Sequence, residues 1–241
     1  MTGAAVGFRY APEVVSRFPT IRGGILLATG VRGGPAPEAL AEAFRAEQAA
    51  VRERLRDAPL AELPALAAWR QAFAAFGVKP TQYRSAAEAL LRRLTKKGDV
   101  PGVNLLTDIG NLVSIRYALP VAVLDTAGVT GTITVRFAQG KEPFVELDGE
   151  EVRHPEPGEV VFVDDAGRVH ARRWCWRQSA ESAAGAGTSQ VLVTVEGLHS
   201  GAEVDVAAAL RDLSALLGRF AGGSSRWELL SPGRPAFGLV V

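Results

Sequence analysis

The sequence contains few cysteine and histidine residues, which form the disulfides and metal sites that stabilise many small proteins. Among 241 residues there is one cysteine, Cys175, so neither an internal disulfide nor a cluster of thiolate ligands is available. The three histidines, His154, His170 and His199, match no local spacing of metal ligands. We therefore expect no metal site, and nothing in the cysteine count points to an oxidising compartment.

Long apolar segments are also missing. No stretch approaches 18 uninterrupted apolar residues, and the first residues, MTGAAVGFRYAPEV, contain no apolar run of signal-peptide length. The composition itself is ordinary for a globular protein, with 47% hydrophobic residues, 22% charged residues and a formal net charge of +1. The sequence predicts a cytoplasmic protein without a membrane partner, and its net charge leaves nucleic-acid binding open.

Several enzyme classes are excluded by motif. The sequence contains no G-x-x-x-x-G-K-[ST] phosphate loop, no G-x-G-x-x-G after a strand, no G-x-S-x-G elbow and no H-E-x-x-H. We therefore expect no cofactor. Cys175, between Trp174 and Trp176, is either a nucleophile or a buried, inert thiol, and the second role is the commoner one for a free cysteine with no histidine near it in sequence.

Hydrophobic spacing predicts helices in the first half of the chain. An Ala-rich helix is predicted over residues 36–57, and a second helix over 62–76 carries one apolar stripe. A third helix begins at Ser85 and Glu88, which form the S-x-x-E pattern of a capping box.

The segment 104–119 also has helical spacing, and it carries an unusual polar stripe. Thr107, Asn111 and Ser114 lie at i, i+4 and i+7, and none of them is charged. Gly110, beside Asn111, costs about 1 kcal/mol relative to alanine inside a helix. Small uncharged hydrogen-bonding residues are unusual on a solvated face, so this stripe is a candidate for ligand binding.

From residue 121 the pattern changes to strands, which are predicted at 121–125, 131–137, 143–147, 159–163, 169–174 and 190–197. The last of these is nearly continuous in apolar residues, as in a strand buried on both faces. A final helix opens with a second capping-box pair, Ser200 and Glu203, and stops near Gly222. A flexible Gly-Gly-Ser-Ser piece and a terminal strand follow.

Helices first, a β-rich middle and then a helix is the order of an α+β fold. The continuous core pattern from Leu66 to Phe220 predicts a single domain over residues 1–241, with the Ala-rich helix packed on its outside.

Two features remain open between a functional and a structural role. Glu196 ends the most apolar strand, so its carboxylate is either a solvated strand-end group or a paired or protonated group in a site. A basic group on the third helix either meets a phosphate backbone or forms a solvated face; it comprises Arg92, Arg93, Lys96 and Lys97, with Lys79 and Arg84 nearby.

The order of motifs resembles a known family. The segments WRQAFAAFGVKP, YRSAAEALLRRL and VPGVNLLTDIGNLVSIRYALPVAVLD follow one another from residue 69. After them come ITVRFAQGKEPFVELDG, GEVVFVDDAG and VLVTVEGL. Together, over roughly residues 65–200, they resemble the editing (B3/B4) domain of the phenylalanyl-tRNA synthetase beta subunit. This resemblance implies a B3/B4-like core and hydrolysis of the ester of a wrongly attached amino acid.

The resemblance also implies roles for individual residues. Asn111 corresponds to the family's asparagine because the nine-residue spacing to Pro120 is retained, and Glu196 corresponds to the glutamate that recognises the polar end of the mischarged side chain. The family's threonine and histidine are replaced by Gly110 and Ala122. The expected binding site comprises Asn111, Glu196, Ser114, Trp176 and Arg177.

Three functions follow from this comparison. The first is a freestanding deacylase that hydrolyses a misaminoacylated tRNA in trans, with a positioned water as the nucleophile and no catalytic side chain named. The second is a noncatalytic module that binds tRNA or an amino acid in the same pocket, which the replacement by Ala122 favours. The third is hydrolysis of a small aminoacyl ester without tRNA, which the basic helix disfavours.

Overall fold

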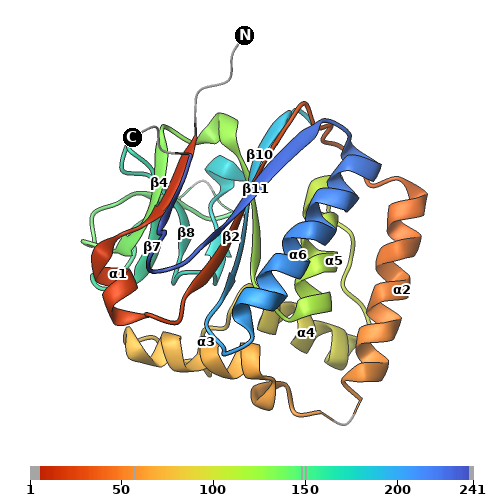
Figure 1. Ribbon diagram of the computed structural model, residues 1–241, viewed down its shortest axis with the longest axis horizontal. Helices are drawn as coiled ribbons and strands as arrows, with labels where there is room; N and C mark the ends of the chain where they lie inside the picture. Colours follow the sequence, from red (N-terminus) through yellow and green to blue (C-terminus); the bar gives the residue numbers. More distant parts are fainter. Residues whose placement is uncertain (1–5, 57, 148, 150, 239–241) are drawn as a thin grey trace.

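The computed structural model describes residues 6–56, 58–147, 149 and 151–238, and the structural statements below concern these residues. Two β-sheets pack face to face, and a layer of helices covers the outer side of one of them (Figure 1). The predicted α+β class is confirmed.

Five of the six α-helices match predicted ones closely, and α1 (Pro12–Arg17) was not predicted. The other five are α2 (Glu38–Arg54), α3 (Pro64–Ala75), α4 (Ala86–Lys97), α5 (Leu105–Tyr117) and α6 (Ala202–Leu216), and α6 continues as a π-helical turn over Leu217–Ala221. Short 3-10 turns lie at Leu60–Glu62, Thr126–Gly128 and Ala180–Ser182. Ser85 caps α4 by accepting a hydrogen bond from the Glu88 backbone N–H at 3.2 Å, as predicted. The Glu88 carboxylate instead pairs with Arg70 at 2.8 Å.

The central four-stranded sheet separates two hydrophobic cores. Its order is β11 (Ser224–Leu230), β2 (Arg22–Thr29), β10 (Gln190–Gly197) and β3 (Val121–Asp125), and every neighbouring pair is antiparallel. Side chains alternate along β10, so Val191, Val193 and Val195 pack against the helices. Leu192 packs in the second core, between the two large sheets, and Thr194 and Glu196 share its side of the strand.

The second large sheet has six strands in the order β12 (Ala236–Phe237), β1 (Gly7–Tyr10), β4 (Thr132–Phe137), β7 (Val160–Val163), β8 (Val169–Arg172) and β9 (Arg177–Gln178). Only the β1–β4 pair is parallel in this described sheet. A separate ribbon pairs β5 (Phe144–Val145) with β6 (Val152–Arg153).

Three sequence-based expectations are corrected. The fold does not begin with helices, because β1 and β2 precede α2 and enter the two large sheets. Gly201, which has no side-chain cap, is the N-cap of α6, so the predicted capping box at Ser200 and Glu203 is wrong. The serines of the Gly-Gly-Ser-Ser piece begin β11, where they pair with β2.

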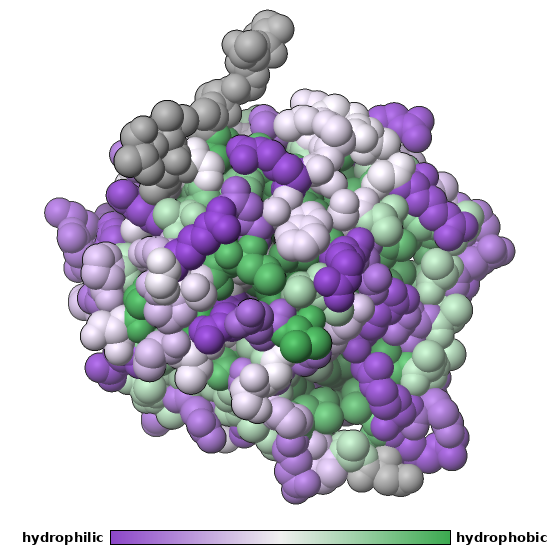
Figure 2. All heavy atoms as spheres, in the orientation of Figure 1, coloured by the Kyte–Doolittle hydropathy of each residue, from purple (hydrophilic) through white to green (hydrophobic). Residues whose placement is uncertain are grey.

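Hydrophilic side chains are spread over the face seen in Figure 1, with hydrophobic ones in patches between them (Figure 2). Among the described residues the exposed large hydrophobic side chains are Val103, Leu147, Val152, Val204 and Trp227. Two of these, Val103 and Leu147, lie at the cavity described next. None of the described helices is long and apolar enough to cross a membrane.

Candidate functional site

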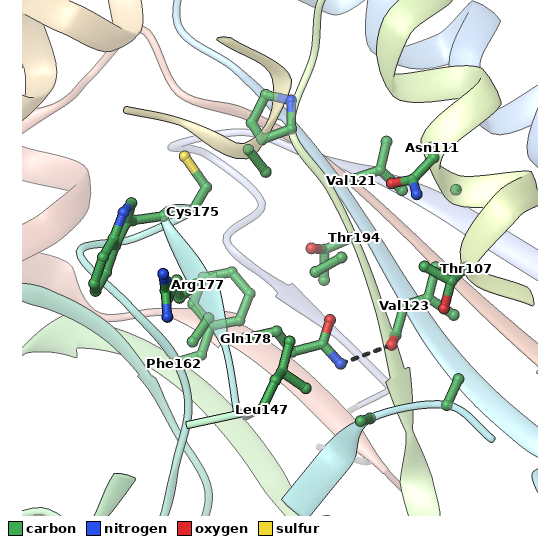
Figure 3. Close-up of a pocket in the computed structure, with 18 of the residues that line it drawn as sticks. Thr107, Asn111, Val121, Val123, Leu147, Phe162, Cys175, Arg177, Gln178 and Thr194 are labelled. Carbon is green, nitrogen blue, oxygen red and sulfur yellow. Dashed lines mark hydrogen bonds between the residues drawn. The ribbon is translucent and has the colours of Figure 1, made fainter. Parts of the chain in front are cut away.

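A cavity of about 330 Å³ lies between α5, β3, β10 and the turn that joins β8 to β9 (Figure 3). Its lining includes both fully buried and largely exposed side chains. Trp174, Thr194 and Glu196 are each at most 2% exposed and form the floor. Val103 and Leu147, at 67% and 55% exposure, form the rim. A cavity of this size falls in the range of about 300–1,000 Å³ that is typical of small-ligand sites.

Glu196 reaches the floor because of its place on β10. Its Oε1 accepts hydrogen bonds from the Tyr10 hydroxyl at 2.7 Å and from Trp174 Nε1 at 2.9 Å. Gly23 is the residue paired with Glu196 across the β2–β10 ladder, and a Cβ at Gly23 would overlap the Tyr10 hydroxyl. A glycine in the middle of the sheet therefore makes room for the contact between Tyr10 and Glu196.

Burial changes the acidity of this carboxyl group. Removal from water raises the pKa of Glu196 to about 7, although the hydrogen bonds from Trp174 and Tyr10 oppose the shift. Glu196 consequently changes its charge near neutral pH, so it can accept a hydrogen bond as a carboxylate or donate one as an acid.

An unusual backbone turn positions Trp174 at the floor of the cavity. Arg173 and Trp174 have φ values of +45° and +62°, a left-handed backbone that residues other than glycine rarely adopt. Such residues cost on the order of 1–3 kcal/mol each and persist where the surroundings hold them. Here the Trp174 backbone N–H donates to the Val160 carbonyl at 2.6 Å, and its indole donates to Glu196. The strained turn thus positions the donor for Glu196.

The α5 wall contains part of the predicted polar stripe. Thr107, Gly110 and Asn111 line the cavity. The predicted placement of Ser114 at the site is corrected: it does not line the cavity, because its hydroxyl donates to the Leu119 carbonyl at 2.7 Å. Ser114 therefore holds the left-handed turn at Ala118 that ends the helix.

Trp176 and Arg177 both line the cavity, and Arg177 lies across it from Asn111 and Thr107 of α5 (Figure 3). Arg177 stacks on the Trp176 ring at 4.9 Å and pairs with Glu146 at 3.1 Å. Arg173 lies over the same indole at 4.5 Å and over the Tyr83 ring at 3.8 Å. The structure therefore brings Asn111, Glu196, Trp176 and Arg177 to one cavity, while their role in binding stays a prediction.

One lining residue, Gln178, was missed by sequence reasoning. Its Nε2 donates to the carbonyl oxygens of Val123 and Ser182, each at 2.9 Å. The side chain lies across the cavity from Asn111 and Thr107 (Figure 3). Spacing gives no signal for this residue, because a glutamine on a two-residue strand has no diagnostic pattern. Only the loose resemblance of residues 176–179 to the family's glycine-rich pocket loop points to this segment.

The cavity offers weak nucleophiles. Cys175 lines it, but burial of the thiol raises its pKa well above the ordinary value, and the nearby Glu196 adds to the shift. A neutral thiol is a poor nucleophile. Ala122, where the resemblance implies a histidine, is a half-buried residue of the cavity wall. The described residues contain no group of three or more histidine, cysteine or acidic side chains placed to hold a metal ion.

The basic residues of α4 lie away from the cavity. Ala86, at the start of the helix, lines the cavity, and the Ala86 N–H donates to the Cys175 carbonyl at 2.7 Å. Lys96 and Lys97 are exposed at the other end, about 15 Å further along the helix. Arg93 is also exposed and Arg92 is half-buried. A contact between these side chains and RNA would therefore be separate from the cavity.

Comparison with known proteins shows the family. The model of the B3/4 domain matches residues 68–221, well over half of the chain, and the protein belongs to this family. That match confirms the resemblance seen in the motifs.

Individual relatives match shorter parts. Phenylalanine–tRNA ligase beta subunits from Shewanella oneidensis and Nitrobacter winogradskyi are 30% identical over 89 residues and 35% identical over 95 residues. These alignments cover 37% and 39% of this chain, but only 11% and 12% of the two relatives. The beta subunit from Cutibacterium acnes is 35% identical over 77 residues, or 32% of this chain and 9% of its own length.

Among solved structures, an N-terminal fragment of the phenylalanyl-tRNA synthetase beta subunit from Pyrococcus horikoshii aligns with 92% of this chain and 51% of that fragment. The TM-score is 0.47 and the sequence identity is 14%.

Proposed function

We propose that this protein is a trans-acting hydrolase that removes a wrongly attached amino acid from tRNA. The observation that carries the proposal is the cavity itself, which brings Asn111 on α5 and Glu196 on β10 to one enclosed space. Membership of the B3/4 family supports it, because the resemblance to the synthetase editing domain implies hydrolysis of such esters. The proposal includes the predicted cytoplasmic location, where a protein that acts on charged tRNA would work.

The reaction needs no protein nucleophile. A water oxygen attacks the ester carbonyl, and the tetrahedral intermediate expels the terminal ribose oxygen, which takes up a proton to leave a free tRNA and a free amino acid. An aminoacyl ester is already activated, so orientation of the water and the ester supplies much of the acceleration. Asn111 would hold the ester or the terminal ribose, and Glu196 would bind the amino group or a polar side chain.

A noncatalytic binding module is the second candidate. The observation in its favour is Ala122, which leaves an apolar wall where the family has a histidine. The same cavity would then bind an aminoacyl group without cleaving it.

The test is deacylation of a panel of mischarged tRNAs by the purified protein. The proposal expects release of at least one amino acid well above the spontaneous rate. Stable binding of a charged tRNA without release would favour the binding module, and neither binding nor release would overturn both candidates.

A matched pair of variants ties any activity to the cavity. Glu196→Gln removes a charge-assisted hydrogen bond, so kcat/KM for the best substrate should fall about ten- to a hundredfold. Glu88→Gln changes another buried carboxylate, which pairs with Arg70 and does not line the cavity, and should leave kcat/KM nearly unchanged. An equal loss in both variants would contradict a specific role for Glu196.

A further inference from the structure

The Gln178 carboxamide has a fixed orientation. Its two N–H hydrogens are both used, one on the Val123 carbonyl and one on the Ser182 carbonyl, each at 2.9 Å. The reverse orientation would place the side-chain oxygen against two carbonyl oxygens, which is unfavourable. Gln178 Oε1 accepts no hydrogen bond from the described residues and turns toward the open middle of the cavity (Figure 3).

Gln178 and Glu196 lie at different depths. Glu196 is 2% exposed at the floor, whereas Gln178 is half-buried and directly follows the exposed Arg177 of the rim. The body of a tRNA is far too large for a cavity of about 330 Å³, so the ester of an aminoacyl-tRNA would lie near the rim. The α-ammonium group lies two bonds from the ester carbonyl carbon, so it would lie at the level of the wall, with the side chain extending toward the floor.

We infer that Gln178 is a specificity-determining residue whose Oε1 accepts a hydrogen bond from the α-ammonium group of the ligand. This inference rests on the proposed function and deepens it. It restricts the ligand to aminoacyl groups with a free α-amine, and it leaves Glu196 to bind a donor on the ligand's side chain. The oriented Oε1 suits this role because the donor, the α-ammonium group, is charged. A hydrogen bond from a charged donor is stronger than one between two neutral groups.

Two nonhydrolysable probes test the inference through binding alone. The first is 3′-deoxy-3′-(L-tyrosylamino)adenosine, and the second is the same molecule without its α-amino group. Isothermal titration calorimetry on the wild type should show tighter binding of the amine by about ten- to a hundredfold. In Gln178→Met the preference should fall to near one, with little change for the des-amino probe.

A matched variant separates this role from a structural one. Gln48→Met also removes a buried glutamine with two backbone hydrogen bonds, to Val100 at 3.0 and 2.8 Å, and neither residue lines the cavity. This variant should lose stability and keep the full preference for the amine. A preference retained in Gln178→Met, or lost equally in Gln48→Met, would overturn the inference.

If Gln178→Met does not fold, the affinities of the wild type for the two probes still test the inference. Equal binding of the two probes by the wild type would overturn the role of Gln178 and leave the proposed function standing. Binding of neither probe would overturn the role of Gln178, and the deacylation panel decides the proposed function separately. A strong preference for the amine without any deacylation would support the role of Gln178 and overturn only the hydrolysis.

Discussion

At the scale of single residues, the raised pKa of Glu196 makes the free energy of unfolding depend on pH. Its folded pKa of about 7 lies above the ordinary value of 4.5, so the folded protein binds this proton more tightly than the unfolded chain. The resulting stabilisation is complete below about pH 4.5 and is lost as the pH rises through 7. The difference is about 3 kcal/mol, from 1.36 kcal/mol per pKa unit.

We therefore predict that Glu196→Gln changes the pH dependence of folding. The substituted glutamine cannot ionise, so the variant should gain about 2–3 kcal/mol relative to the wild type between pH 5 and pH 8. Urea unfolding of both proteins across this range measures the difference, in which the contributions of other titrating groups cancel. A difference that stays constant with pH would show that Glu196 does not titrate there.

A second residue-scale prediction concerns Tyr10. Its hydroxyl donates to Glu196 and lowers the pKa of that carboxyl, so Tyr10→Phe should move the stability inflection to higher pH. Tyr117→Phe is the control, because the Tyr117 hydroxyl donates to Asp212 at 2.9 Å outside this cavity. The same unfolding series should show no shift for the control. An equal shift in the two variants would contradict the assignment of the inflection to Glu196.

At the scale of elements, the packing of α5 on β3 depends on Gly110. A Cβ at this position would lie 2.8 Å from Val123 Cγ2, on a branched and stiff side chain. Alanine in a helix normally gains about 1 kcal/mol over glycine, whereas overpacking costs about 1–3 kcal/mol. We predict that Gly110→Ala lowers the free energy of unfolding and that adding Val123→Ala reverses much of the clash. Gly218→Ala, where a Cβ meets nothing within 4 Å, should cause no such loss.

The basic end of α4 belongs to the same scale. If it contacts a phosphate backbone, Lys96→Glu with Lys97→Glu should weaken tRNA binding whatever the tRNA sequence, and lower the salt slope by about one unit per lost contact. Filter binding across a salt series measures both effects. The control is the double variant Arg219→Glu with Arg226→Glu, which reverses the charge of two exposed arginines beyond α6. It should leave tRNA binding and the salt slope unchanged. An unchanged slope for the lysine variant would assign α4 to the solvated surface.

At the scale of the whole molecule, the central sheet joins the two cores. Leu26 on β2 packs in the helical core, and its neighbours Ile25 and Leu27 pack in the core between the sheets. The single domain predicted over residues 1–241 should therefore unfold in one cooperative transition. Limited proteolysis should yield no pair of stable, folded halves from cuts near residues 100 or 150, and recovery of such halves would contradict the prediction.

The sequence predicts those helices and strands whose apolar spacing or capping residues match the positions that they take in the fold. The strand over 190–197 and the helix after Ser85 were found because apolar spacing and a cap define them directly. β1 and β2 were missed, since their pairing partners lie far away in the chain and glycines interrupt β2. Glu196 could be predicted because a carboxylate at the end of an apolar strand is unusual in any sequence. Gln178 could not, because its orientation is set by two backbone carbonyl groups that only the fold brings near it.

The central claim is that the cavity between α5 and β10 holds the aminoacyl end of a tRNA. The most direct measurement is a crystal structure of the protein with 3′-deoxy-3′-(L-tyrosylamino)adenosine. We predict that the amino-acid part lies in the cavity, between Asn111 and Glu196, with the adenosine at the rim beside Trp176 and Arg177. An empty cavity with the probe bound elsewhere on the molecule would contradict the claim.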